Sequence, residues 1–178
     1  METLEAIFTR KSIRNYLNKP LPREALETIL KAGTSGPSCV NAKDWAFLVV
    51  EEKDMLYRMA EANGRPAEPL KSAAAGILIL GDLNRAFPPA KDYWIIDGAI
   101  AGQNMVLAAQ ALGIGSVWLG TWPQMDRVDA QRKLFALPEH MIPHSILALG
   151  YPDETSESNK HSAKEENPYT DFIHYEQF

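Results

Sequence analysis

The stretch from Ile95 to Leu112 constrains the fold of this 178-residue chain more than any other. Its apolar residues fall on most of the circumference of a helix, which predicts a buried helix rather than an amphipathic one. The polar residues that interrupt it argue against a membrane span, which needs about 20 predominantly apolar residues. These are Asp97, Gln103, Asn104 and Gln110. Such a helix can form the core of a monomer or lie at a subunit interface. We expect an interface, because a chain of this length supplies few other elements to cover all its sides.

The composition limits the kinds of protein that this chain can be. It can bury one substantial core, and we expect a single domain. The formal net charge of −5 and the lack of a basic stripe argue against a nucleic-acid surface, so any bound phosphate must be held locally. A single cysteine, Cys39, excludes an internal disulfide. The acidic N-terminus lacks the pattern of a signal peptide, so we expect a cytoplasmic protein without a membrane partner.

The hydrophobic pattern alternates helices with short buried strands, which predicts an α+β protein built as a mixed α/β sandwich. We expect strands over Trp45–Val50, Ala75–Leu80, Ser116–Leu119 and Ser145–Gly150. Besides the central helix, we expect helices over Thr3–Arg10, Leu21–Ala32 with Pro22 in its first turn, Glu51–Ala62 and Met125–Phe135. Thr3 would cap the first of these, Leu4, Ile7 and Phe8 would share its apolar face, and Gly33 would end the second.

The C-terminal part of the chain changes character after the last expected strand. The stretch from Tyr151 to Pro168 is polar and cannot pack a core of its own. The residues beyond it are too apolar for a free tail, and they include Tyr169, Phe172, Ile173, Tyr175 and Phe178. We therefore expect the tail to dock, either on its own subunit or on a neighbour.

The segment RKSIRNY, from Arg10 to Tyr16, concentrates three cations and a serine between apolar anchors. Such a cluster taken alone is most often a solvated surface. Here Ile13 and Tyr16 tie the segment to the core, so its cations are held in place. Forked, charge-assisted guanidinium donors beside a hydroxyl suit a phosphate group. The segment is thus either a solvated surface or a phosphate site.

The run from Gly33 to Trp45 is rich in Gly, Ser, Pro and Asn and predicts a long loop. Loops of this length in compact domains tend to be functional. The donors Ser38 and Asn41 can contact the polar edge of a ring, although an ordinary connector is equally compatible with the pattern.

No constellation in the sequence predicts catalysis by side chains alone. There is no Ser-His-Asp triad, and no carboxylate pair is flanked by residues that would tune it. Pro143 separates His140 from His144, so the two histidines do not share the helical face that a metal site would use, and we expect no metal. The chemistry is therefore expected to come from a cofactor.

Four blocks in order resemble the nitroreductase family of FMN-dependent oxidoreductases. They are RKSIRNY, PSCVNAKDWAFLVV, AIAGQNMVLAAQALGIGSVWLG and HSILALGYP, and they span nearly the whole chain from about residue 7 to 152. The resemblance implies a nitroreductase-like fold, with a central, mostly antiparallel sheet flanked by helices. It also implies an intertwined homodimer with two FMN sites at its interface. Residues 1–152 would then form the FMN-binding core, and residues 153–178 an extension that wraps the partner subunit.

The resemblance also assigns site residues. It makes Arg10, Lys11, Ser12 and Arg14 contacts of the phosphate, ribityl chain and pyrimidine edge. It makes Pro37, Ser38, Cys39 and Asn41 the partner subunit's contribution to the same flavin. Trp118, Leu119 and Gly120 would lie beside the ring and offer backbone groups near N5. A basic residue after the last core strand would meet the phosphate, with Lys160, His161 and Lys164 as candidates. Electrostatically, a cation near the N1/O2 edge would stabilise the reduced flavin, and Arg14 or Lys71 can serve.

The implied function is an NADH- or NADPH-dependent FMN oxidoreductase that reduces a planar, electron-poor acceptor such as a nitroaromatic or quinone by a ping-pong mechanism. Alternatives are a specialised flavin reductase or dehalogenase of the same fold, a non-enzymatic FMN-binding protein, and a helical binding protein without a cofactor. The chain departs from the family at Cys39, where small or hydroxyl residues are common. The segments that form a substrate lid in larger members are short here, at Gly64–Lys71 and Leu83–Lys91. We do not expect Cys39 to act as a nucleophile.

Overall fold

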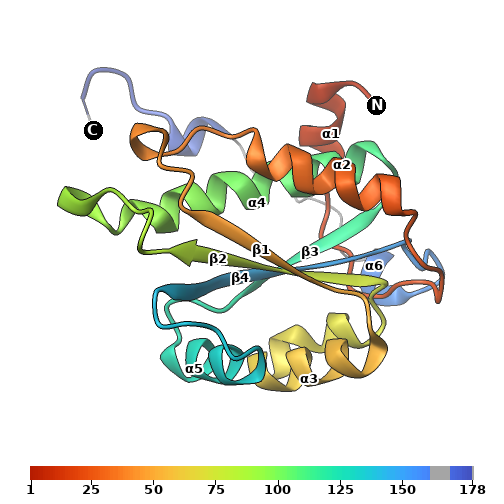
Figure 1. Ribbon diagram of the computed structural model, residues 1–178. Helices are drawn as coiled ribbons and strands as arrows, with labels where there is room; N and C mark the ends of the chain where they lie inside the picture. Colours follow the sequence, from red (N-terminus) through yellow and green to blue (C-terminus); the bar gives the residue numbers. More distant parts are fainter. Residues whose placement is uncertain (161–168, 178) are drawn as a thin grey trace.

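The computed structural model describes residues 1–160 and 169–177, and its centre is a four-stranded sheet. The strands are β1 (Trp45–Val50), β2 (Ala75–Asp82), β3 (Gly115–Gly120) and β4 (Met141–Gly150). They lie in the order β1-β2-β4-β3, and all three neighbouring pairs are antiparallel. The expected α+β class and antiparallel sheet are therefore confirmed (Figure 1).

Helices cover both faces of this sheet (Figure 1). The α-helices are α1 (Thr3–Thr9), α2 (Arg23–Thr34), α3 (Lys53–Asn63), α4 (Tyr93–Ala111), α5 (Met125–Leu134) and α6 (Glu157–Lys160). Short 3-10 helices are η1 (Cys39–Asn41), η2 (Arg65–Lys71), η3 (Pro88–Ala90) and η4 (Tyr169–Phe172). Helices α2 and α4 lie on one face, and α3 and α5 on the other. The sequence pattern predicted all four strands and the five longer helices, with differences at their ends.

The two central strands carry the core because both of their faces are covered. All eight residues of β2 are buried, as are the last eight of β4. Side chains alternate along β2. Ile77 and Ile79 pack with α2 and α4, whereas Leu78 and Leu80 pack with α3 and its neighbours. Burial on both faces explains why these strands read as continuous apolar runs.

Strand β4 begins earlier than its sequence predicts. It starts at Met141 and contains Pro143, although proline normally argues against a strand interior. The pairing with β2 shifts at this point, since Ile79 pairs with Ser145 and Leu80 with Pro143. His144 is thus an extra residue on β4, and a bulge is a place where a strand tolerates proline.

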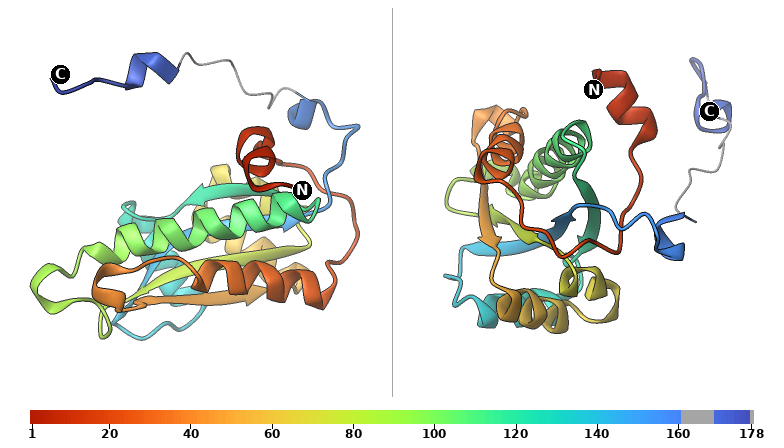
Figure 2. Two further views of the ribbon diagram at one scale, coloured as in Figure 1. Left: turned by 90° about the horizontal axis from the view of Figure 1, so that it is seen from above. Right: turned by 90° about the vertical axis from the view of Figure 1, so that its right-hand side faces the viewer.

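Two expectations about helix ends are wrong. Gly33 does not stop α2 but lies within it, and a Cβ there would come 2.2 Å from the terminal methyl carbon of Met105. The glycine therefore lets α2 approach α4 closely. Thr3 does not cap α1, because the cap position is Glu2 and no side chain caps the helix. The expected apolar face of α1 is also uncovered, as Phe8 is 68% exposed and the helix stands away from the sheet (Figure 2).

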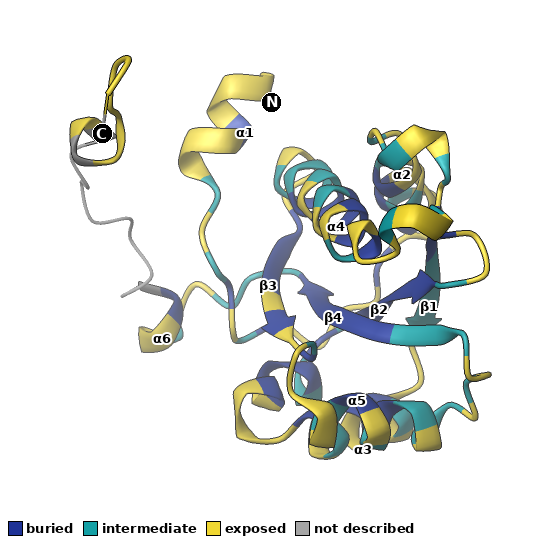
Figure 3. Cartoon of the chain, turned by 90° about the vertical axis from the view of Figure 1, so that its left-hand side faces the viewer, coloured by how far each residue is buried: buried dark blue, intermediate teal, exposed yellow. Residues whose placement is uncertain are grey.

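Helix α4 is buried on one side only within this chain. Its inner face packs on the sheet, while Ile96 on the outer face is 53% exposed. A surface groove of about 500 Å³ follows this outer face and is lined by Ile95, Ile96, Ala99, Ile100, Gln103 and Asn104. Figure 3 shows how buried and exposed residues alternate around α4. The expectation that this face meets a second subunit stays a prediction.

The aromatic side chains of the described part of the tail are largely exposed. Phe172 is 74% exposed and Tyr175 85% exposed. Docking on a neighbouring subunit stays a prediction. None of the helices in the described part of the chain combines the length and apolar character needed to cross a membrane.

Candidate functional site

The segment from Arg10 to Tyr16 runs along the outer edge of β3 and is fixed there by two buried residues. The backbone N–H of Ile13 donates to the carbonyl of Ser116 at 2.9 Å. The Tyr16 hydroxyl donates to the carbonyls of Ile13 and Ala148, at 2.6 and 3.1 Å. Burial of this hydroxyl raises its pKa, so it stays a donor. The cations between these anchors are therefore held at defined positions.

Asn159 ties the same segment to α6, a contact that the sequence did not reveal. Its side-chain oxygen accepts from the backbone N–H of Arg14 at 2.9 Å, and its amide nitrogen donates to the carbonyls of Asn15 and Asp153 at 2.8 and 2.9 Å. The side chain is 3% exposed. The start of the C-terminal extension thus buttresses the cationic segment.

Arg10 and Ser12 face a crevice between α1, α4 and β3. It has a volume of about 510 Å³ and is lined by Ile7, Arg10, Ser12, Gln103, Val106, Ser116 and Trp118. Its aromatic wall is Trp118, whose ring lies against Gly102 of α4, where a Cβ would come 2.4 Å from the indole. Gly102 therefore makes room for this ring, a contact that no sequence motif indicates. A guanidinium, a hydroxyl and a flat aromatic surface meet in this crevice.

The outer edge of β3 presents backbone groups to the same region. Because Ser116 accepts from Ile13, its N–H and C=O point away from β4, and those of Trp118 and Gly120 point the same way, since alternate residues of a strand share this direction. The carbonyl of Gly120 is engaged by Asn63 and Arg127, each at 3.1 Å. Leu119 is 4% exposed and packs in the core, and its backbone groups face β4, so it offers neither its side chain nor its backbone to this region.

A second crevice, of about 700 Å³, lies on the other side of the cationic segment. Its charged lining residues are Arg14, Arg65, Lys71 and Glu68. Lys71 forms ion pairs with Glu61 at 2.6 Å and Glu68 at 2.9 Å, and these carboxylates raise its pKa. The charge of Lys71 is thus already balanced. Of the two cations expected near the N1/O2 edge, Arg14 is the better candidate.

The loop after α2 holds the second set of expected site residues, Pro37, Ser38, Cys39 and Asn41. Val40, Asn41 and Lys43 have φ values of 47°, 60° and 50°, a left-handed region that is strained for a β-branched residue such as valine. The backbone N–H of Cys39 donates to Asp97 of α4 at 2.9 Å, and that of Lys43 to the Ser38 hydroxyl at 2.9 Å. These bonds hold a strained loop in one shape.

The two sets of residues do not line a common crevice among those described above. The loop is bonded to Asp97, and Gly36 before it lies against Ile100 and Asn104 of α4. The crevice of Arg10 and Ser12 meets α4 at Gln103 and Val106 and includes no residue of the loop. Figures 1 and 2 show the loop and α1 toward opposite ends of α4.

A pair of buried acids lies beneath this loop, contrary to the expectation that no tuned carboxylate pair exists. Asp44, just before β1, is 1% exposed and Asp97 is 2% exposed. Burial and then the adjacent Asp97 raise the pKa of Asp44 to about 6. Burial, Asp97 and Asp44 also raise the pKa of the Cys39 thiol, which opposes a nucleophilic role. The two acids are far apart in sequence, so their pairing had no local signal.

His144 has a structural role. His144 is buried, and its Nδ1 and Nε2 lie 2.9 Å from the Ser145 hydroxyl and 3.0 Å from the Ile95 carbonyl. Burial lowers its pKa. Its ring also meets Trp94 and Trp118 edge-on. Within residues 1–160 and 169–177, no three His, Cys, Asp or Glu residues gather in a way that could hold a metal ion.

The remaining expected residues are placed only in part. Lys11 lies beside a smaller crevice of about 320 Å³, and its Nζ is 3.5 Å from the Asn159 carbonyl. Lys160 ends α6. His161 and Lys164 lie outside the described residues.

The donor set fits FMN. A phosphate carrying up to two charges needs nearby cations. Arg10 supplies one in the crevice of Ser12 and Trp118, and Lys11 and Arg14 of the same segment line the neighbouring crevices. A flat ring needs an aromatic or apolar wall and backbone donors at its polar edge, which Trp118 and the free edge of β3 supply. Fold and site thus define a class: an α+β protein with a cationic sheet edge suited to a planar, anionic cofactor.

The family follows from comparison with known proteins. A family model described as "Nitroreductase family" matches residues 7–79 and 67–151, which together make up most of the chain. This chain therefore belongs to the nitroreductase family, as the four sequence blocks predicted.

Individual relatives agree with this assignment. The chain is 43% identical over 154 residues to a protein of Methanothermobacter thermautotrophicus named "Putative NADH dehydrogenase/NAD(P)H nitroreductase", with 86% of this chain and 79% of that protein covered. A crystal structure of a protein with the same name from Bacteroides thetaiotaomicron has a TM-score of 0.87 at 36% identity, covering 99% of this chain and 98% of the other. The NADPH:FMN oxidoreductase of Vibrio harveyi, solved in complex with NAD+, has a TM-score of 0.86 at 25% identity, covering 99% and 77%.

Proposed function

We propose that this protein uses NADH or NADPH to reduce a planar, electron-poor acceptor such as a nitroaromatic or a quinone, with FMN bound at the edge of β3. The broad class is an NAD(P)H-dependent oxidoreductase with FMN as cofactor, in line with relatives named FMN reductase [NAD(P)H] and NADPH-flavin oxidoreductase. The proposal adds to this class the kind of acceptor, the ping-pong order and the individual site residues.

The observation that carries the proposal is the crevice in which Arg10, Ser12 and Trp118 meet beside the free edge of β3. In this arrangement Arg10 balances the charge of the phosphate, and Ser12 donates or accepts a hydrogen bond at the ribityl chain. The indole of Trp118 forms the wall against the ring, and the N–H groups of β3 are directed at the polar edge of the ring. Arg14 supplies positive charge from the second crevice.

A second copy of the chain would complete this site. The loop from Pro37 to Asn41 does not line the crevice of its own chain, and we propose that it contributes to the crevice of the partner subunit. The apolar outer face of α4 supports the same arrangement, because an exposed apolar groove is a feature of a contact surface. The exposed aromatic residues of the tail would then rest on the partner.

The chemistry of the reaction comes from the cofactor and the chain positions the reactants. When bound, FMN supplies a ring that takes up a hydride from a nicotinamide and delivers electrons to an acceptor. The side chains around the crevice bind and orient; none is required as an acid or base. Nicotinamide and acceptor need the same exposed ring face, so they bind in turn, which predicts ping-pong kinetics.

The experiment that tests the function is the visible absorption spectrum of the purified protein with FMN, before and after adding NADH or NADPH without oxygen. Flavin bands that bleach support the oxidoreductase, and bands that persist with both nicotinamides indicate an FMN-binding protein without this activity. Rates with nitroaromatics, quinones and halogenated phenols then identify the acceptor class. Uniformly slow nitro reduction would favour a specialised reductase or dehalogenase.

The site itself is tested by Arg10→Ala. A hydrogen bond to a charged group contributes about 1.5–3 kcal/mol, so we expect FMN binding to weaken about tenfold to a hundredfold. Arg58→Ala, which removes an exposed guanidinium from α3, is the matched control and should leave the affinity unchanged. Equal FMN affinity in the Arg10 variant and the wild type would place the phosphate elsewhere.

A further inference from the structure

The buried acids Asp44 and Asp97 are not used by the proposed reaction. Neither carboxylate oxygen of Asp44 receives a hydrogen bond from an N–H or O–H group, although both are fully buried. An unpaired buried carboxylate is strongly unfavourable, and two adjacent carboxylates cannot both carry a charge without large repulsion. One proton shared between the two side chains resolves both problems.

The surroundings favour a proton on Asp44. Asp97 already accepts the N–H of Cys39 at 2.9 Å, whereas no group of another residue donates to the Asp44 carboxylate. A proton on Asp44 gives this carboxyl a donor toward Asp97. Two weaker influences oppose the effect of burial and Asp97 on the pKa of Asp44: its own nearby backbone N–H and then the guanidinium of Arg85, in the turn after β2.

The other neighbouring acid does not compete for this proton. Asp82 of β2 bonds to Asp44 only through the backbone, its N–H donating to the Asp44 carbonyl at 2.7 Å. The Asp82 carboxylate accepts the N–H of Asn84 at 3.0 Å and lies 4.0 Å from the His140 ring. The thiol of Cys39 stays protonated beside the pair, because the two acids and its own burial raise its pKa.

The pair holds the loop that carries the second set of site residues. Its one bond to the loop reaches Cys39, in the middle of Pro37–Lys43, directly before the left-handed residues Val40 and Asn41. Strained backbone persists only where its surroundings hold it. The strength of the Asp97–Cys39 anchor therefore decides how firmly the loop keeps its shape.

We propose that Asp44 and Asp97 share one proton and act as a positioning pair for the loop Pro37–Lys43, so that the contribution of this loop to FMN binding depends on pH. The inference rests on the proposed function, in which the loop meets the flavin of the partner subunit. The protonated pair holds the loop in its binding shape. Loss of the proton places two negative charges side by side beneath the loop and loosens it.

The direction of the pH dependence follows from linkage. The pKa of Asp44 in the folded chain, about 6, lies above its ordinary value of 3.8. The proton is therefore present at pH 5 and largely lost at pH 8. FMN should bind more weakly as the pH rises through this range. A shift of one pKa unit corresponds to a factor of ten, so an elevation of about two units limits the effect to about a hundredfold, and we expect about tenfold.

The test measures FMN release, by fluorescence, from the diluted full-chain holoprotein between pH 5 and pH 8. The variant is Asp44→Asn, whose amide donates to Asp97 at every pH. The phosphate of FMN also titrates near pH 6, so the measured quantity is the ratio of wild-type to variant dissociation constants, in which that effect cancels. We expect the ratio to rise about tenfold from pH 5 to pH 8. Asp129→Asn on α5 is the control and should follow the wild type.

The outcomes separate the inference from the proposed function. A ratio that stays constant with pH, in a protein that binds FMN, overturns the positioning role and leaves the function intact. No FMN binding at any pH contradicts the proposed function itself.

The wild type offers an independent measurement if Asp44→Asn does not fold. Hydrogen exchange of the Cys39 amide, corrected for its intrinsic pH dependence, should lose protection between pH 5 and pH 8. Unchanged protection would overturn the inference.

Discussion

The two faces of the sheet differ in how completely one chain covers them. On the face of α3 and α5 the core closes within the chain, and Leu56, Met59 and Leu70 have no exposed surface. Gln131 of α5 even donates to the Met59 carbonyl at 2.9 Å, which joins the two helices on this face. On the face of α2 and α4, Ile96 of α4 stays in solvent, and Figure 3 shows exposed stretches along both helices.

The function is therefore expected on the face that one chain leaves uncovered. The closed face provides stability, and its side chains are occupied with one another. The open face carries the crevice of Arg10 and Ser12, the strained loop and an uncovered apolar helix surface. A surface that a single chain leaves unfinished is where a second chain and a cofactor are expected to bind.

The largest expected effect comes from a substitution in the core between the sheet and α3, on the closed face. Leu78 of β2 has no exposed surface and packs with the core between the sheet and α3. Leu78→Ala should lower the free energy of unfolding by about 2–5 kcal/mol, through lost burial and a cavity. Urea denaturation measures it, with Met125→Ala, at an exposed position of α5, as the comparison. An equally large loss from both variants would contradict the view that the burial of Leu78 causes the effect.

A substitution on the open face should instead weaken the dimer. Ile96→Glu places a charge on the outer face of α4, and a charge buried without a partner is costly. We expect the dimer to weaken by about a hundredfold or more, which corresponds to about 3 kcal/mol. Light scattering after size exclusion measures it. Lys133→Glu on α5, at the closed face, should leave the dimer intact; a wild-type protein that is monomeric at all concentrations would refute the interface.

Asp44→Asn should change the pH dependence of stability. The raised pKa of Asp44, about 6 against 3.8, means that its contribution to stability is fully present below pH 3.8 and is lost as the pH rises through 6. At pH 8 the asparagine variant should therefore be more stable than the wild type by about 1–3 kcal/mol, and at pH 4 the two should be nearly equal. Thermal unfolding at both pH values measures this. A variant less stable at pH 8 would mean that Asp44 is ionised and stabilising.

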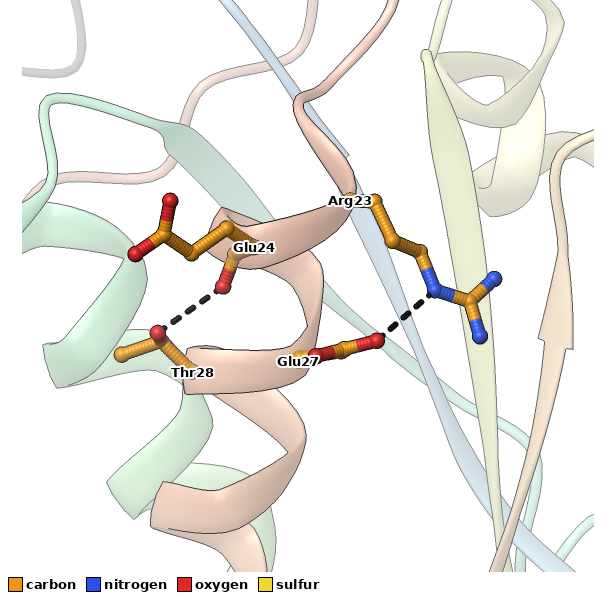
Figure 4. A network of polar contacts seen from close by, with 4 residues as sticks. All are labelled: Arg23, Glu24, Glu27 and Thr28. Carbon is orange, nitrogen blue, oxygen red and sulfur yellow. Dashed lines mark hydrogen bonds and ion pairs between the residues drawn. The ribbon is translucent and has the colours of Figure 1, made fainter.

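The smallest effect is expected at a surface ion pair on α2. The Nε of Arg23 lies 3.1 Å from the Glu27 carboxylate, and both side chains are largely exposed (Figure 4). Glu27→Gln should change stability by less than about 0.5 kcal/mol, and added salt should reduce that change further. A double-mutant cycle with Arg23→Gln measures the pair. A coupling well above 1 kcal/mol would show that this surface is less solvated than its exposure suggests.

Much of the fold could be predicted because its elements are local. Strand β1 has the expected bounds, and β2 and α4 differ from expectation by two residues or fewer at each end. The errors arose where a distant contact overrides the local pattern. Gly33 looks like a helix stop, yet it serves a close approach to Met105, and Pro143 looks like a strand breaker, yet a bulge at His144 accommodates it.

The candidate site could be predicted in part. Arg10, Ser12 and Trp118, named from the family resemblance, line one crevice. The structure also shows contacts that no sequence motif indicates. Lys71 forms ion pairs with two carboxylates, and Gly102 makes room for the indole of Trp118. Such roles depend on partners far away in the chain, so the residue type alone does not reveal them.

The alternation of helices and strands, the anchoring of the cationic segment by Ile13 and Tyr16, and the membership of the family follow from the sequence, because periodicity and motif order are properties of neighbouring residues. The fold of the whole chain places Asp44 against Asp97, leaves one face of α4 uncovered and keeps the loop Pro37–Asn41 out of the crevice of Arg10 and Ser12. Burial and proximity arise when distant segments pack, and they set the charge of an acid and the surface left for a second subunit.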